Sequence, residues 1–256
     1  MLLNRLGYEV TEQACGPALY EHVRKDHPGV VFNLSSIYGW DKANLVPAVL
    51  EIAGVRYTGS GMLGLLLARN YTRLFPILQN SGVRVPSFRL VGARDLAAIH
   101  GIQFPLHLYQ DGKKNALFIN NKIELEKILR KLTLHEKVLL MEPIAGKMES
   151  LFILDGMPFL RIPRQATLEL AQKAYQLMEA KGLARFDFIQ GSQPILINIE
   201  ISPDPLGKDL LREAELAGWD AAHILKLLVE HAGNDTSDVL QNPIFEPVNP
   251  YLSPVR

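Results

Sequence analysis

The chain has 256 residues, enough to bury one large core or two to three smaller ones. Hydrophobic residues make up 48% and charged residues 21%, which is typical of a folded globular protein. The 27 Lys and Arg residues balance the 27 Asp and Glu residues, so no overall charge attracts nucleic acid or anionic lipid. The single cysteine, Cys15, excludes an internal disulfide, and no apolar run reaches the roughly 18 residues of a membrane span. We therefore expect a cytoplasmic protein whose partners include neither nucleic acid nor a membrane.

Helices and strands alternate over the first 63 residues, which predicts an α/β layer. Residues 2–13 resemble the end of a helix that is followed, after Gly7, by a short strand. A sheet domain normally begins with a strand, so a first strand is either lost or encoded upstream. The further elements expected here are a buried strand at 28–36, a helix at 44–55, and a short strand with a glycine-serine turn at 56–61.

Residues 64–140 predict a second piece, which the helical segment at 62–82 opens. Pro76 is expected to kink or divide this helix, because proline has no N–H and clashes with the preceding turn. The further elements expected are an extended stretch at 83–91, strands at 104–110 and 115–120 joined by a DGKK turn, an amphipathic helix at 122–132, and a strand at 138–144.

Residues 141–233 predict a third piece, and 234–256 predict a tail because they contain four prolines and no periodicity. The elements expected in the third piece are a strand at 150–156 with a hairpin turn, a helix at 168–182 closed by Gly182, a hairpin over 183–202, and one or two helices at 206–233.

The hairpin at ARFDFIQGSQPILINIEIS gathers polar side chains on one face. Arg185 and Asp187 alternate with apolar residues along its first strand, and Asn198, Glu200 and Ser202 alternate with isoleucines along its second. A four-residue loop, GSQP, would place Asp187 opposite Asn198 and Arg185 opposite Glu200. All the polar groups then lie on the same side of the ribbon.

Two interpretations of this face remain open. Directly opposed Cβ atoms lie about 5 Å apart and diagonal ones about 7–8 Å, so Asp187 and Glu200 can converge on one point. Two carboxylates with a neutral oxygen suit Mg²⁺, and Arg185 beside them would bind a phosphate or an oxyanion. The alternative is an ordinary half-buried hairpin with an exposed Arg–Glu pair.

The order of several segments resembles the D-alanine–D-alanine ligase branch of the ATP-grasp family. These segments are VFNLSS, GWDKANLVPAVLEIAGVRYTGSG, GVRVPSF, FPLHLY, VLLMEPIAGK, ARFDF and INIEIS. The resemblance implies an ATP-grasp-like α/β fold of three pieces, 1–63, 64–140 and 141–233, with the first one truncated. It also implies that ATP and Mg²⁺ lie between the second and third pieces. A small-molecule carboxylate, from an amino acid or peptide, would be joined to an amine through an acyl phosphate; a homodimer is left open.

The resemblance also assigns roles to the polar hairpin. Asp187 and Glu200 match the metal-binding carboxylates of the family, and Ser202 stands where the family has a metal-binding asparagine. Arg185 matches the arginine that supports the phosphate and the tetrahedral intermediate. Gly207, one position later than expected, matches a glycine whose backbone faces the substrate.

The nucleotide site implied by the resemblance departs from the family pattern. Tyr71 and Tyr109 occupy the places of two lysines that hold ATP phosphates, and the glycine-rich phosphate loop and the long substrate loop are missing. Two lost contacts of roughly 1.5–3 kcal/mol each would weaken ATP binding by about two to four powers of ten. The residues expected to contact ATP are Met141, Glu142 and Ile144 at a strand end, and Lys113 and Lys114 in the DGKK turn.

Two hypotheses of function follow from this mixture of kept and lost features. The first is an ATP-dependent carboxylate–amine ligase with a divergent ATP site. The second is a catalytically inactive relative that binds a ligand or another protein.

Overall fold

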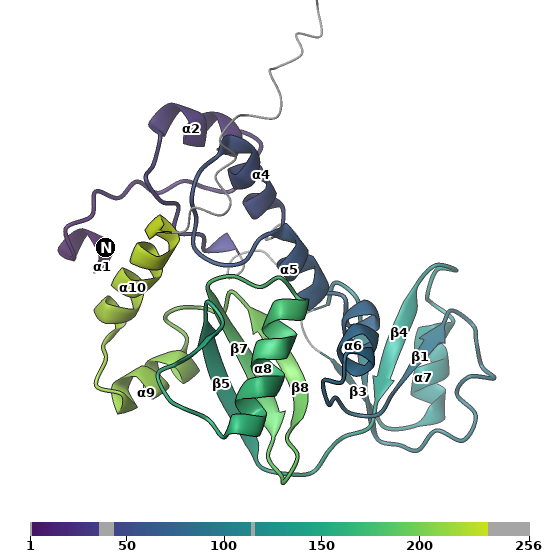
Figure 1. The fold of residues 1–256 in the computed structure, drawn as a ribbon. Coiled ribbons are helices and arrows are strands. Elements are labelled where there is room, and N and C mark those ends of the chain that lie inside the picture. Colours follow the sequence, from purple (N-terminus) through teal and green to yellow (C-terminus); the bar gives the residue numbers. More distant parts are fainter. Residues whose placement is uncertain (1, 36–43, 114–115, 235–256) are drawn as a thin grey trace, which may run out of the picture.

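The computed structural model describes residues 2–35, 44–113 and 116–234. Two antiparallel sheets lie side by side, and the N-terminal helices extend above them (Figure 1). The helices are α1 (Leu2–Arg5), α2 (Leu19–Asp26), α4 (Leu45–Ala53), α5 (Met62–Ala68), α6 (Tyr71–Asn80), α7 (Lys122–Leu129), α8 (Gln165–Leu177), α9 (Lys208–Leu216) and α10 (Ala221–Asn234). The strands are β1 (Phe88–Gly92), β2 (Leu106–Gln110), β3 (Leu117–Ile119), β4 (Lys137–Met141), β5 (Met148–Leu154), β6 (Met157–Phe159), β7 (Leu183–Ile189) and β8 (Ile195–Ile201). This mixture confirms the expected α/β class, whereas the division into three pieces stays a prediction.

The N-terminal part contains less sheet than its sequence predicts. The expected helix at 44–55 is α4, and Gly54 ends it in the left-handed conformation that glycine adopts without strain. Among the described residues of the run at 28–36 there is only one parallel bridge, between Val31 and Tyr57, and residues 8–13 form no strand. Both strand predictions were wrong in extent, because a β-branched run forms a ladder only where a second segment lies alongside it.

The long helical segment is divided, but not at Pro76. Helix α5 ends at Ala68 and α6 starts at Tyr71, so Pro76 lies inside α6. Asp111, from the turn after β2, accepts hydrogen bonds from the Thr72 amide at 3.0 Å and from the Thr72 hydroxyl. This carboxylate satisfies donors at the start of α6, which places the break there.

The first sheet has the strand order β1-β4-β2-β3, and all its pairs are antiparallel. The expected strands and the amphipathic helix α7 are present. Leu125 and Leu129 of α7 are fully buried against the sheet, whereas Ile123 is 66% exposed. The helix therefore covers one face of this sheet and leaves the other face toward α6 and the second sheet.

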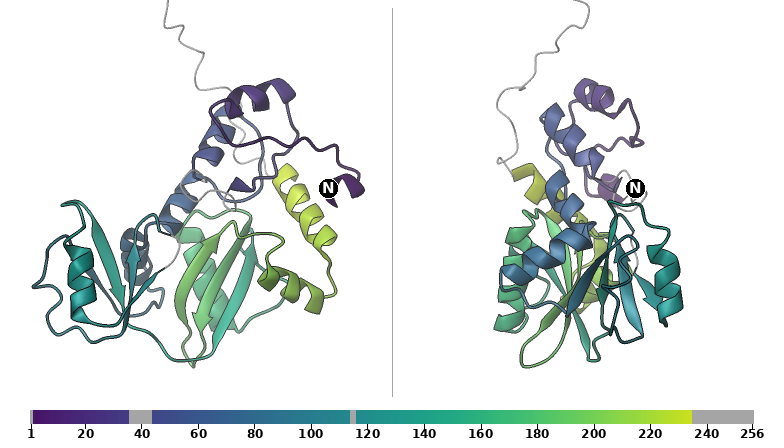
Figure 2. Two further views of the ribbon diagram at one scale, coloured as in Figure 1. Left: turned by 180° about the vertical axis from the view of Figure 1, so that it is seen from behind. Right: turned by 90° about the vertical axis from the view of Figure 1, so that its right-hand side faces the viewer.

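The second sheet has the strand order β6-β5-β7-β8, again with antiparallel pairs. Helix α8 packs on one face, and α9 and α10 pack on the other (Figure 2). Helix α8 starts three residues earlier than expected and ends at Leu177, so Gly182 does not cap it. Gly182 lies instead in the turn before β7, with φ +62°.

One hydrophobic core joins the two sheets. Leu139 and Met141 of β4 belong to the same buried cluster as Phe186 and Phe188 of β7, and Phe75 of α6 lies in it as well. Helix α6 thus sits between the sheets, beside the edge strand β8 (Figure 1). In the part of the chain that the structure describes, no helix has both the length and the apolar character to cross a membrane.

Candidate functional site

The polar hairpin forms as β7 and β8, and its register matches the expected one where the polar residues lie. Arg185 pairs with Glu200, and Asp187 pairs with Asn198. All four side chains therefore lie on the face of the second sheet that α9 covers in part. The predicted clustering of polar groups on one face is confirmed.

Beyond Asp187 the register shifts by one residue. Ile189 pairs with Ile195, whereas the expected loop would have paired Gln190 with Ile195. The predicted loop was therefore wrong, because a β-bulge places one extra residue in β8. The bulge lies on the loop side of the polar pairs and leaves them aligned.

Asp187 is the centre of the cluster, and its side chain is only 3% exposed. Arg185 donates to it twice, from Nε to Oδ1 at 2.8 Å and from Nη2 to Oδ2 at 3.0 Å. Ser150 Oγ donates to Oδ1 at 2.7 Å, and Asn198 Nδ2 donates to Oδ2 at 2.8 Å. An ionised carboxylate has about four lone-pair sites, so these four bonds occupy the acceptor capacity of Asp187.

Arg185 links this carboxylate to α9. Its Nη1 lies 2.9 Å from Oδ2 of Asp209 and 3.6 Å from Oε2 of Glu200. The hydrogen bonds to Asp187 are the main cause that raises the pKa of Arg185 above its ordinary value, and the charges of Glu200 and Asp209 add to them. Arg185 is thus held by carboxylates on three sides.

Two stacked tyrosines close the cluster on the side of the first sheet. The Tyr71 hydroxyl donates to Asn198 Oδ1 at 2.9 Å, and its ring stacks on that of Tyr109 with centroids 4.6 Å apart. Burial is the main cause that raises the pKa of both tyrosines, and the charges of Glu200 and Asp187 raise that of Tyr71 further. Both rings are therefore neutral at pH 7, in the places where the family resemblance expects lysines.

The three expected metal ligands are not arranged as an open magnesium site. Asp187 is saturated, and Ser202 Oγ accepts a hydrogen bond from the Ser60 amide at 3.0 Å. Glu200 is the exception, because its side chain is 33% exposed and, among the described residues, it makes only the long contact to Arg185. Within residues 2–35, 44–113 and 116–234, no group of three or more His, Cys, Asp and Glu residues could hold a metal ion. Mg²⁺ does not fit this donor set as it stands, so the metal assignment stays a prediction.

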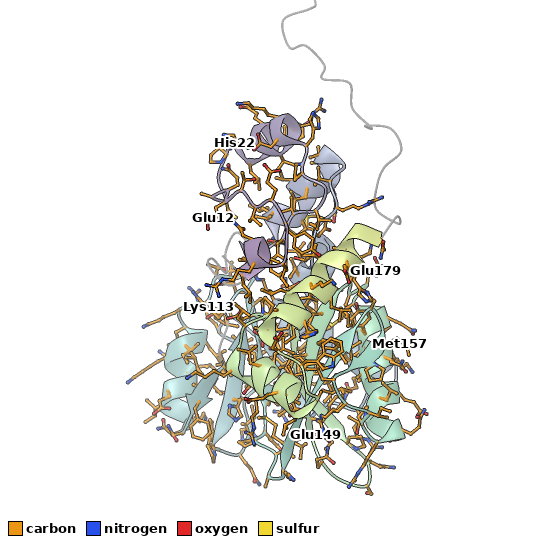
Figure 3. All side chains as sticks on the ribbon, turned by 90° about the vertical axis from the view of Figure 1, so that its left-hand side faces the viewer. Glu12, His22, Lys113, Glu149, Met157 and Glu179 are labelled. Atoms are coloured by element: carbon orange, nitrogen blue, oxygen red, sulfur yellow. The ribbon has the colours of Figure 1, made fainter. Side chains whose placement is uncertain are left out.

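The residues expected to contact ATP are scattered. Met141 is buried in the core that joins the sheets, with 4% exposure. Glu142 is exposed and Ile144 is half-buried after the end of β4. Lys113 lies on the exposed turn after β2 (Figure 3), and Lys114 lies outside the described residues. Their nucleotide-binding role stays a prediction.

Sequence reasoning missed two members of the cluster. Ser150 comes from β5, where it pairs with Asp187, and Asp209 comes from the first turn of α9. Gly207, which was expected to face a substrate, directly precedes α9 and donates its amide to Asp204 O at 3.0 Å. The only sequence signal for Asp209 was its position two residues after that glycine.

No protein-family model matches the chain. The D-alanine–D-alanine ligase of Methylobacterium radiotolerans is 33% identical over 100 residues, which cover 39% of this chain and 32% of that ligase. The ligase of Caulobacter vibrioides is 34% identical over 104 residues, which cover 40% and 32%. These alignments span about a third of the length of each relative. The ligase of Parvibaculum lavamentivorans is 25% identical over an aligned length of 279 residues, which covers 91% of this chain and 90% of that ligase.

The fold also has a close counterpart among solved structures. The crystal structure of D-alanine–D-alanine ligase from Bacillus anthracis complexed with ATP superposes with a TM-score of 0.71 and 16% identity. The superposition covers 90% of this chain and 89% of that one. The chain is therefore similar in sequence to D-alanine–D-alanine ligases over most of its length and shares their ATP-grasp fold.

Proposed function

We propose that this protein is a catalytically inactive member of the branch, which uses the fold as a ligand-binding module. The single observation that carries the proposal is the state of Asp187. Its four hydrogen bonds come from Arg185, Ser150 and Asn198, and they occupy the lone pairs that a cation would need. A carboxylate that is buried and saturated in this way stabilises the fold and has no lone pair left for a cation.

The tyrosine stack supports the same conclusion. The phosphates of a nucleoside triphosphate need cationic or N–H donors, but Tyr71 and Tyr109 present neutral, buried rings beside the cluster. Placing a triphosphate there would bury its charges next to aromatic faces. Removing these charges from water costs several kcal/mol, as for other buried ions, unless new hydrogen-bond donors replace the lost water.

Thermal unfolding in the presence of nucleotide tests the proposal. A ligand that binds only the folded state stabilises it by mass action. The melt is compared in three conditions: protein alone, with Mg·ATP, and with ATP plus EDTA. We expect no difference that depends on Mg²⁺. A Mg²⁺-dependent rise in the melting temperature that disappears in Glu200→Gln would show that the cluster binds Mg·ATP and would contradict the saturation of Asp187 on which the proposal depends.

An active ligase is the second candidate, and one specific observation favours it. Arg185, Asp187 and Glu200 are still neighbours on β7 and β8, and Glu200 keeps free acceptor capacity. If the Asp187 contacts opened, these groups would hold Mg²⁺ and a transferring phosphate while ATP activates a carboxylate for attack by an amine. The substrates would then be amino acids or peptides.

Phosphate release separates the two candidates. The active ligase predicts release of inorganic phosphate from ATP that depends on an added D-amino acid and on Mg²⁺. We expect none above the rate of the Glu200→Gln variant, which removes the carboxylate of the cluster that keeps free acceptor capacity.

A further inference from the structure

A pocket of about 850 Å³ lies beside the Asp187 cluster, between β5, the start of α8 and α9. Its volume is within the range of about 300–1,000 Å³ that small-molecule sites occupy. Ser150 and Asp209 of the cluster line one side of it, but neither Tyr71 nor Tyr109 does. The pocket is therefore separate from the space between the two sheets where the resemblance would place ATP.

Arg161 forms a fixed wall of this pocket. It donates from Nη1 to Glu149 Oε1 and from Nη2 to the Ser150 carbonyl, and its Nε lies 3.4 Å from Glu213 Oε2. The segment between β6 and α8 is thereby tied to both β5 and α9. Figure 3 labels Glu149 at the lower end of the second sheet, in the view that has α9 and α10 in front.

Each acidic side chain of the pocket already has an ion-pair partner. Glu149 and Glu213 both pair with Arg161, and Asp209 pairs with Arg185. The lining contains four basic side chains and three acidic ones, so its net charge is positive. The carboxylates of the lining thus form ion pairs that hold the elements around the pocket together.

Three basic side chains of the lining are different. Lys147 precedes β5, Arg164 directly precedes α8, and Arg212 lies on α9. Within the part of the chain that the structure describes, none of the three makes an ion pair or a side-chain hydrogen bond, and all are exposed. They come from three separate elements and surround one cavity, so a single ligand can meet all of them.

The start of α8 adds to this positive potential. The first turn of this helix contains no acidic residue, and no side chain caps it. Unpaired N–H groups at a helix start favour an anion, and this contribution acts together with that of Arg164.

We propose that this pocket binds a small molecule that carries two or more anionic groups, phosphate or carboxylate. The inference deepens the proposed function, since it names the class of ligand that an inactive module would hold. It needs neither Mg²⁺ nor the Asp187 lone pairs, so it can fail while the inactive assignment stands.

Isothermal titration calorimetry at low ionic strength tests it, with inorganic tripolyphosphate as the phosphate probe and citrate as the carboxylate probe. We expect saturable binding of at least one probe without Mg²⁺. Arg164→Gln and Arg212→Gln should each weaken that binding by about tenfold, the effect of one charge-assisted contact. Arg130→Gln, which removes an exposed arginine directly after α7 with an ion pair to Glu126, should leave it unchanged.

The two probes distinguish the source of the anion. Binding of tripolyphosphate alone assigns a phosphorylated ligand, and binding of citrate alone assigns a polycarboxylate. No saturable heat with either probe, or an equal loss in Arg130→Gln and in both pocket variants, overturns the proposal.

Discussion

Replacing Asp187 by Asn tests whether the carboxylate stabilises the fold or belongs to a vacant metal site, because the two roles predict opposite signs. In the structure Asp187 is the counter-charge of Arg185, which contacts it twice, and its side chain is 3% exposed. The substitution keeps the size of the side chain, removes its charge, and replaces one acceptor oxygen by an NH2 group that faces the donors of Arg185 and its neighbours. The positive charge of Arg185 then loses its main partner.

The expected loss follows from the geometry. Removing one member of a buried ion pair costs about 3–5 kcal/mol, because the other charge stays buried without compensation. Arg185 is 20% exposed and keeps Asp209 at 2.9 Å and Glu200 at 3.6 Å, so its charge is not fully stranded. We therefore expect the free energy of unfolding at pH 7 to fall by about 2–4 kcal/mol, at the lower side of the buried-pair range.

Urea denaturation of the wild type and of Asp187→Asn measures this loss. The matched control is Asp26→Asn, at an exposed aspartate of α2, which should change the free energy of unfolding by no more than about 0.5 kcal/mol. In an empty metal site, two carboxylates held close together repel one another, so neutralising one would raise stability. An unchanged or increased stability of Asp187→Asn would show that the reasoning about the cluster is wrong.

Two further substitutions test the surroundings of the cluster. Tyr71→Phe leaves Asn198 Oδ1 without its donor and should cost about 1–2 kcal/mol at pH 7 in urea denaturation. Burial raises the pKa of Tyr71, so its contribution to the free energy of unfolding is complete below the unfolded-state pKa near 10 and is lost as the pH rises above it. The fall of the unfolding free energy at alkaline pH should therefore be less steep in Tyr71→Phe, by up to about 1.4 kcal/mol per pH unit. Gly59→Ala would place a Cβ atom 2.5 Å from Ser202 Oγ at φ +93°, whereas Gly156→Ala at φ +80° meets no atom within 4 Å. The second should cost about 1–2 kcal/mol from strain alone and the first clearly more, and equal melting temperatures would contradict the close contact.

The polar hairpin could be predicted because the alternation of polar and apolar residues within each strand shows which side chains share a face. Alternation with a period of two separates Arg185 and Asp187 from the apolar residues between them, and the same holds for Glu200 in β8. The bulge after Asp187 escaped prediction, because loop composition does not fix the number of residues that a turn contains.

The hydrogen-bond shell of Asp187 could not be predicted in the same way. Ser150 reaches Asp187 from 37 positions away in the chain, and Asp209 reaches Arg185 from 24 positions away, and no spacing in the sequence connects either of them to the hairpin. Their approach depends on β5 pairing with β7 and on α9 packing over the sheet. The N-terminal strand at 28–36 was overpredicted for a related reason, since its partner is decided by tertiary structure and not by its own residues.

The shared core around α6 has a mechanical consequence. Leu139 of β4 and Phe186 of β7 lie in one continuous buried cluster with Phe75 of α6. Separating the two sheets would therefore expose all three side chains to water. Each square ångström of apolar surface exposed in this way costs about 25 cal/mol, a penalty that no hinge loop relieves. The two sheets should therefore unfold cooperatively, in a single calorimetric transition. A motion that separates them should cost a free energy comparable to that of partial unfolding.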